Sequence, residues 1–383
     1  TREIDYGLSL GLFNNRITME ADYYNKETSN LLLEVPLPST SGYQTAFKNL
    51  GLVSNKGYEF AVNANMIENR DFNWNMNFNI SFNENKVLDL GDADEFFVTA
   101  IGDNQTNNDY VVRVGESLGS IYGLAYDGVY NYQDFVEFDG MSIDEAASKL
   151  YADAAAVGDD GTEMWWGLNQ YTLKYGVPLN ALVTNGTYRP GMTKFKDING
   201  DGVINDDDRH IIGNTLPKYF GGMTQNFNYK NFDLSIQTSW SYGNDIYNKT
   251  LKKGAQTAVP WRNKFSIVDD RWSPTNPDGT FTAFSAGNSG DVNSAAYDLY
   301  LEDGSYFRIG NISLGFTLPK DLIRKIGVKN LRIYASMDNV HIWTKYSGWD
   351  PDVSVGNNQL TPGLDVDSYP RSRTFRTGIV ARF

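Results

Sequence analysis

The stretch Phe72–Asn83 reads FNWNMNFNISFN, so six large apolar residues alternate with six small polar ones. A period of two sends successive side chains to opposite faces of a β-strand. One face is therefore entirely apolar, and the other is polar and almost all asparagine. The stretch also reaches the length of about 9–11 tilted residues that a strand needs to cross a membrane. We expect a transmembrane β-strand with lipid on one side and a hydrated lumen on the other.

The same alternation recurs before and after this stretch. It is found in segments 6–12, 17–23, 58–66, 219–229, 232–242, 306–316, 331–343 and 375–383, which brings the expected crossing strands to nine. In 306–316 and 331–343 the period shifts partway along the segment. Such a shift predicts β-bulges near Gly310 and Asn339.

The connections between these segments alternate between two size classes. The short ones are 14–16, 68–71, 230–231 and 319–329, and the long ones are 30–56, 85–119, 133–218, 248–304 and 347–371. A transmembrane barrel sorts its connections in this way, with short periplasmic turns and long extracellular loops. We therefore expect an all-β, antiparallel transmembrane β-barrel, with barrel strands in 1–85 and 219–383 and an extracellular lobe in 86–218.

The order of the connections also predicts the direction of the chain. If the short turns are periplasmic, nine crossing strands place Thr1 on the outer side. A single-chain bacterial barrel has an even number of strands, so we expect this chain to be the C-terminal part of a larger barrel. Segment Tyr122–Tyr132 has strand character too, but it lies between two outer ends. It either pairs with a crossing strand or joins Thr187–Lys196 in the lobe, and we favour the lobe.

Composition disfavours several other classes of protein. The chain of 383 residues has a formal net charge of −14, which argues against nucleic acid as a partner. It has no cysteine, so thiolate and disulfide chemistry is excluded. No run of about 20 apolar residues occurs, which excludes a helical membrane protein. Aromatic residues make up 14% of the chain, as in the aromatic girdles of a barrel, although carbohydrate-binding β-proteins are rich in them as well.

Signals for catalysis are weak along the whole sequence. His210 and His341 are the only histidines and are far apart, and neither a Gly-x-Ser-x-Gly elbow nor a phosphate-binding loop occurs. Adjacent carboxylates such as Asp269 and Asp270 are poor candidates for the acid pair of a glycoside hydrolase. We therefore expect no enzymatic activity.

The loop 197–208 carries oxygen-bearing side chains in a defined pattern. Its sequence, DINGDGVINDDD, has such residues at positions 1, 3, 5, 9 and 12 and glycine at position 6, as in an EF-hand-type calcium loop. Position 12 is Asp instead of the usual Glu, and Pro190-Gly191 interrupts any preceding helix. We expect Ca²⁺ to stiffen the external lobe here, the alternative being an acidic turn without metal. The expected ligands are Asp197, Asn199, Asp201, the carbonyl of Val203, Asn205 and Asp208.

Two further features belong to the long loops. A helix is expected over 142–157, because Ser142 and Glu145 form a capping box before an alanine-rich run. Aromatic rings outside the strand pattern are candidates for contact with substrate or a partner protein, since sugars stack on rings and Tyr and Trp favour interfaces. Loop packing and membrane anchoring are the alternatives. The candidates are Trp165, Trp166, Trp261, Tyr346 and Trp349.

Several motifs, taken in order, resemble a known family. They are GYEF at 57–60, the calcium-type loop, YKNFDL at 229–234, GNDIYN at 243–248, FRIGNISLGF at 307–316 and WDPD at 349–352. This series resembles SusC-like TonB-dependent outer-membrane transporters of Bacteroidetes-type bacteria, and the resemblance covers nearly the whole chain. Phe383 also looks like the terminal aromatic residue of such barrels.

The resemblance implies TonB-dependent import of oligosaccharides or peptides across the outer membrane, with the loops facing the exterior. It further implies a SusD-like surface lipoprotein as a lid, and TonB acting on a plug that, like the first barrel strands, is missing from this sequence. Outer-membrane lipid would surround the wall. From the residues alone, a secreted calcium-stabilised β-sandwich that binds glycans or mediates adhesion is the alternative.

Overall fold

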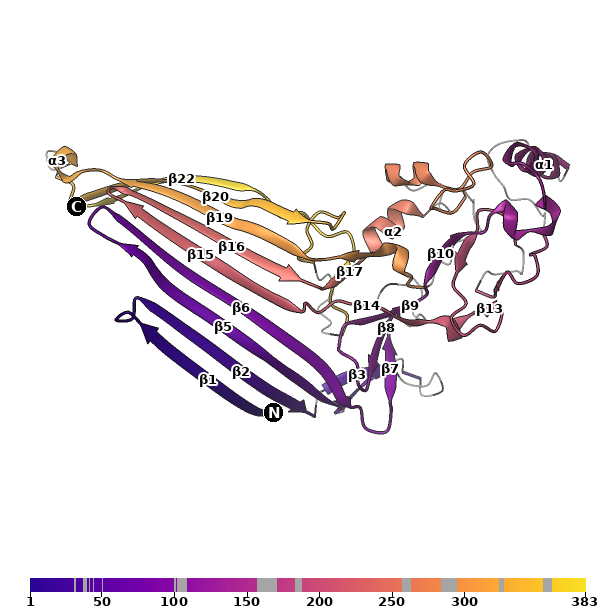
Figure 1. Cartoon of the computed structure of the whole chain (residues 1–383), viewed down its shortest axis with the longest axis horizontal. Helices are drawn as coiled ribbons and strands as arrows, with labels where there is room; N and C mark the ends of the chain where they lie inside the picture. The colour runs from indigo at the N-terminus through magenta and orange to yellow at the C-terminus, as the bar shows by residue number, and fades with distance from the viewer. Residues whose placement is uncertain are drawn as a thin grey trace.

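The computed structural model describes residues 1–30, 32–36, 40, 42–43, 45–49, 51–99, 101, 109–156, 171–182, 188–256, 263–283, 295–323, 327–353 and 360–383. These residues form a long sheet and a lobe that lies at one end of it (Figure 1). No helix in the described part of the chain is long and apolar enough to cross a membrane.

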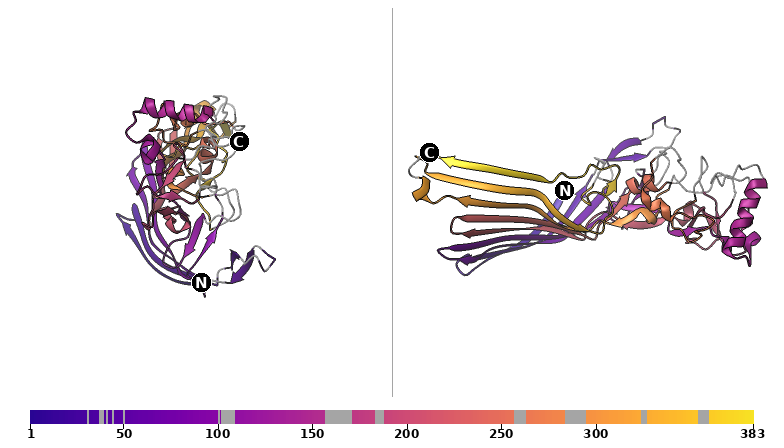
Figure 2. Two further views of the ribbon diagram at one scale, coloured as in Figure 1. Left: turned by 90° about the vertical axis from the view of Figure 1, so that its right-hand side faces the viewer. Right: turned by 90° about the horizontal axis from the view of Figure 1, so that it is seen from above.

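The long sheet consists of nine antiparallel strands that follow one another in chain order, which confirms the nine strands predicted from the sequence. Seen along its length, the sheet bends through an arc (Figure 2). Its strands are β1 (Arg2–Leu12), β2 (Ile17–Ser29), β5 (Leu52–Glu68), β6 (Phe72–Asp89), β15 (Tyr219–Tyr229), β16 (Phe232–Tyr242), β19 (Tyr306–Thr317), β20 (Asn330–Thr344) and β22 (Thr374–Arg382).

The register of the sheet gathers apolar side chains on one face. Phe78 of β6 lies opposite Val62 of β5 and Met223 of β15, and its ring stacks on Trp240 with 5.6 Å between centroids. The six apolar side chains of Phe72–Phe82 all keep part of their surface exposed. Among the described residues, no second layer buries them, as a β-sandwich would require. A continuous apolar face without a protein cover fits contact with lipid.

Both predicted bulges are present. The pairing of β19 with β20 shifts at Gly310, and the same shift leaves Asn339 and its neighbour out of register on β20. Asn339 has a φ of +52°, a left-handed conformation that Asn tolerates better than most residues. The extra residues explain why the apolar period changes parity partway along these two segments.

Short and long connections sort to opposite ends of the sheet, as predicted (Figure 1). The tight turns β1–β2, β5–β6 and β15–β16 lie at the same end as the C-terminus, together with the short helix α3 (Lys320–Ile323) of the β19–β20 connection. All long connections leave from the other end and build the lobe. This arrangement is the one that separates periplasmic turns from extracellular loops in an outer-membrane barrel.

In its described residues, the lobe contains short strands and the helices α1 and α2, joined by irregular segments. One sheet has the order β14-β9-β8-β7, a second has the order β18-β17-β21, and three pairs are β10 with β12, β11 with β13 and β3 with β4. The pairing of β10 with β12 confirms that Tyr122–Tyr132 joins the lobe. The elements are β3 (Leu32–Pro36), β4 (Thr45–Asn49), β7 (Glu95–Val98), β8 (Tyr110–Arg113), β9 (Ser120–Gly123), β10 (Tyr126–Val129), α1 (Ile143–Ala156), β11 (Leu179–Asn180), β12 (Thr193–Phe195), β13 (Val203–Ile204), β14 (His210–Asn214), β17 (Asp245–Asn248), α2 (Lys249–Ala255), β18 (Leu301–Asp303) and β21 (Leu364–Asp365).

Among the described residues, the buried hydrophobic clusters lie mainly in the lobe, and one of them extends to Val53 and Val87 at the ends of β5 and β6. The largest cluster joins residues from the connections β6–β15, β16–β19 and β20–β22, including Tyr110, Phe195, Tyr247, Tyr297 and Leu364. Connections that are far apart in the sequence therefore pack against one another in one cluster. The helix α1 begins as predicted, because Ser142 N donates to Glu145 Oε2 at 2.9 Å and Glu145 N donates to Ser142 Oγ at 3.4 Å.

Candidate functional site

The calcium-type loop 197–208 is wrapped around its own carboxylates. Asp197 accepts hydrogen bonds from Gly200 N at 2.7 Å and from Gly202 N at 2.8 Å, one on each carboxylate oxygen. Both glycines have positive φ, +75° and +85°, which lets the backbone fold tightly around this side chain. Asp201 accepts from Val203 N at 2.8 Å. In the first half of the loop, the carboxylates of Asp197 and Asp201 thus accept hydrogen bonds from the backbone amides of the same loop.

Asp208 closes the loop from its other end. It is fully buried, and its carboxylate accepts from Ile198 N and from Asn205 N, each at 2.8 Å. The twelfth position is therefore tied to both the second and the ninth. The strand β13 inside the loop pairs in parallel with β11, which anchors the loop to the rest of the lobe.

The donor set of this loop fits a hard cation. Asp197, Asp201 and Asp208 form no ion pair within the described part of the chain, although the loop of 12 residues carries five carboxylates. Among the residues described, no three His, Cys, Asp or Glu side chains are already gathered as a metal site. The amide oxygens of Asn199 and Asn205 and the carbonyl of Val203 would therefore have to complete the coordination, as EF-hand-type loops do with oxygen ligands.

The aromatic candidates differ in their surroundings. Trp349 is 72% exposed and can meet a ligand or a partner. Tyr346 is buried, and its hydroxyl donates to Asp365, so it links two parts of the connection between β20 and β22. Burial, followed by this hydrogen bond, raises the pKa of Tyr346 far above its ordinary value. Trp165, Trp166 and Trp261 lie outside the described residues.

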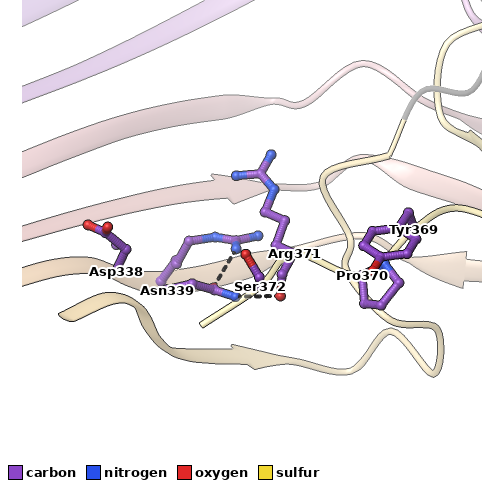
Figure 3. Close-up of a pocket in the computed structure, with 8 residues that line it drawn as sticks. Asp338, Asn339, Tyr369, Pro370, Arg371 and Ser372 are labelled. Carbon is purple, nitrogen blue, oxygen red and sulfur yellow. Dashed lines mark hydrogen bonds between the residues drawn. The ribbon is translucent and has the colours of Figure 1, made fainter. Parts of the chain in front are cut away.

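A pocket of about 540 Å³ lies beside the bulge of β19 and β20, close to the end that carries the lobe. Figure 3 shows Asn339 beside Arg371 and Ser372, with Tyr369 and Pro370 farther away on the right, and Asn339 Nδ2 donates to Arg371 O at 3.1 Å. Arg308 lines the pocket and lies on the polar face of the sheet, because its neighbour Phe307 lies on the apolar face.

Arg308 is the centre of a buried ion-pair network. Its two guanidinium nitrogens donate to the two carboxylate oxygens of Asp350 at 3.0 and 2.5 Å, and the first also donates to Asn339 Oδ1 at 3.1 Å. Arg371 approaches Asp350 to 3.5 Å and pairs with Asp352. The Trp349–Asp352 segment is thereby pinned to the barrel wall.

This network could not be identified from the sequence. The two partners Arg308 and Asp350 are 42 positions apart, and no spacing rule connects them. The available signal was indirect, because the expected bulges at Gly310 and Asn339 mark the place where the strands depart from regular pairing. Bulges often re-aim a side chain beside a functional site.

The polar face of β6 forms a ladder of amides across neighbouring strands. Asn75 donates to Asn65 Oδ1 at 2.9 Å, Asn83 donates to Asn55 Oδ1 at 3.3 Å, and Tyr24 donates to Asn83 at 2.9 Å. These groups are neutral and partly satisfied by one another. They supply neutral hydrogen-bond donors and acceptors on the polar face of β6.

Comparisons with known proteins find relatives that match nearly the whole chain. The chain is 33% identical over 389 residues to TonB-dependent receptor P3 of Formosa agariphila, a match that covers 100% of this chain and 34% of that protein. It is 27% identical to TonB-dependent receptor SusC of Bacteroides thetaiotaomicron, over 98% of this chain and 31% of SusC. The chain therefore spans about one third of the length of these relatives. No family model matches it.

A solved structure supports the fold. The RagAB peptide transporter superposes with a TM-score of 0.69 over 98% of this chain and 34% of the matched chain, at 19% sequence identity. At that identity the likeness concerns the architecture alone. It shows that the nine-stranded sheet and its lobe share the architecture of the matched third of that chain.

Proposed function

Because this chain belongs to the SusC-like TonB-dependent receptors of the bacterial outer membrane, we propose that it forms wall and extracellular lobe of a nutrient importer. The observation that carries the proposal is the uncovered apolar face of the nine-stranded sheet, combined with connections sorted by length to its two ends. A protein with this surface needs lipid around the sheet. A secreted β-sandwich would have to bury that face beneath a second sheet.

The solute is an oligosaccharide or a peptide too large for porins. Two features support this assignment: the named relatives include SusC, and the solved structure with the same architecture is a peptide transporter. The neutral amide ladder on the polar face suits solutes that must pass without being trapped. The chain contributes a passage and a binding surface rather than a reaction.

A SusD-like lipoprotein acts as the lid over the lobe, and TonB acts on a plug within the barrel. The lobe supports this assignment because it lies at the end of the sheet with the long connections and exposes Trp349 there. Aromatic residues with exposed rings are enriched at the centres of protein interfaces.

Deletion of the gene in its native host tests the proposal. Growth on a panel of oligosaccharides and peptides as sole carbon source should fail for at least one member, and deletion of tonB should produce the same defect. Both growth defects should be reversed by the intact gene. Unimpaired growth on the whole panel, or release of the protein from membranes by alkaline carbonate without detergent, would contradict an importer embedded in the membrane.

We also propose that Ca²⁺ stabilises the lobe through the loop 197–208. The support is the curled backbone around Asp197, the clamp made by the buried Asp208 and the lack of an ion pair for these carboxylates in the described residues. A bound cation would offset the repulsion among the three carboxylates. Its role is structural, since the loop is paired with β11 within the lobe.

A further inference from the structure

A second hollow, of about 590 Å³, lies on the apolar face of the sheet where β15, β16, β19 and β20 meet the lobe. Its wall is mainly aromatic. Trp240 connects it to the apolar face, because the same ring stacks on Phe78 of β6. The principal lining residues are Tyr219, Trp240, Tyr242, Phe307, Trp343 and Lys345.

The aromatic side chains form a continuous row across three strands. The ring of Trp240 lies parallel to that of Phe307 at 6.2 Å, and Phe307 contacts Trp343 at 5.8 Å. Trp343 and Tyr242 remain about half exposed, so the row has a free surface. Its place at the lobe end of the crossing strands is the level at which aromatic belts meet lipid headgroups.

A cation stands at the outer edge of this row. Lys345 is exposed and lines the hollow, one residue beyond the end of β20 and two after Trp343. Within the described residues it forms no ion pair. Asp303, which also lines the hollow, accepts a hydrogen bond from Ser305 N at 2.9 Å and interacts electrostatically with Lys345 without forming an ion pair. An exposed ammonium at the edge of an apolar hollow complements an amphiphile with an anionic headgroup.

We propose that this hollow binds one phosphate-bearing lipid of the outer leaflet. Its acyl chain lies against Trp240, Phe307 and Trp343, and its phosphate contacts Lys345. The site rests on the membrane orientation of the proposed function, since the apolar face must meet lipid. It differs from general solvation by the bilayer in two respects: it holds a defined number of molecules, and it selects them by headgroup charge.

Native mass spectrometry of the intact protein in detergent tests the site. The two probes are dipalmitoyl phosphatidic acid and dipalmitoylglycerol, which have the same acyl chains and differ by the phosphate. One phosphatidic acid per protein should bind, more tightly than the glycerol lipid on the order of fivefold, as one lysine near an anionic headgroup contributes. Lys345→Gln should reduce the preference to near one, and Trp343→Ala should weaken the binding of both lipids.

The matched control is Lys230→Gln. Lys230 is also exposed, and its ammonium lies 5.4 Å from the ring centroid of Tyr229, but it belongs to the turn at the opposite end of β15 and β16. This variant should retain the full preference. Equal binding of the two probes by the unaltered protein, or equal effects of Lys345→Gln and Lys230→Gln, would overturn the site.

The result separates this proposal from the proposed function. A protein that needs detergent for extraction but binds neither probe in a defined ratio would overturn the lipid site alone. A protein that leaves the membrane in alkaline carbonate would overturn the membrane orientation, and with it the basis of both proposals.

Discussion

At the scale of single residues, the two faces of β6 predict opposite responses to charge. Phe78 lies among apolar neighbours on the uncovered face, while Asn77 lies on the polar face, where its amide donates to Asn75. Phe78→Arg should cost about 2–4 kcal/mol of folding free energy in lipid, because a guanidinium near the middle of the bilayer loses its hydration. Asn77→Arg should cost far less.

The measurement is reversible folding into lipid vesicles under a urea gradient, followed by heat-modifiable migration on a gel. Both variants add the same side chain one position apart on one strand, so each controls for the other. Equal losses would contradict the assignment of the two faces.

Asp350 offers a second test at this scale. Removing its charge by Asp350→Asn leaves Arg308 buried without its carboxylate partner, and a broken buried pair costs about 3–5 kcal/mol. Asp352→Asn is the matched control, because that carboxylate is half exposed and its ion pair contributes no more than about 1 kcal/mol.

Release of the segment 346–353 from the wall can be followed by the rate of proteolytic cleavage there. Asp350→Asn should be cleaved faster than both Asp352→Asn and the unaltered protein. Similar cleavage of the two variants would show that the network does not hold the segment.

At the scale of elements, the loop 197–208 should couple lobe stability to Ca²⁺. Free Ca²⁺ at 100 times its Kd should stabilise the lobe by about 2.7 kcal/mol, and EDTA should remove this effect. Asp208→Asn should abolish the response, with Asp201→Asn as a second variant if the first fails to fold. The measurement is the thermal unfolding temperature of the intact protein in detergent, with and without EDTA.

Asp207→Asn is the control for this loop. Asp207 belongs to the same acidic run, but its side chain is exposed and stands at a position without a ligand role. It should retain the response to Ca²⁺. An unfolding temperature that EDTA leaves unchanged would contradict the calcium proposal.

The bounds of some strands could be predicted from the sequence more accurately than those of others, for physical reasons. The bounds of β15 and β16 match their apolar periods, because both strands lie wholly in the alternating environment. By contrast, β6 continues to Asp89, beyond the alternating stretch, because Val87 leaves the wall and enters a core with Leu90 and Val112. The alternation of apolar and polar residues reflects what surrounds each face of a strand. It therefore does not predict the end of a strand that continues from the sheet into a protein core.

At the scale of the whole molecule, the sheet was predictable and the lobe was not. Alternation needs only neighbouring residues, whereas the lobe core unites Tyr110, Tyr247 and Leu364 from distant connections. The Arg308 network is a contact of the same long-range kind. A local pattern therefore specified the wall, while the surfaces available for recognition depend on contacts that no local pattern encodes.

The central claim is that lipid contacts every second side chain of the wall. Because the chain has no cysteine, single cysteines can be placed at each position of Phe72–Asn83 and spin-labelled without background. Collision of each label with oxygen, which concentrates in the hydrocarbon, and with a water-soluble nickel chelate should be measured by electron paramagnetic resonance in vesicles. The account predicts oxygen maxima at the six apolar positions and nickel maxima at the six polar ones. A profile without this period of two, or high nickel collision on both faces, would contradict it.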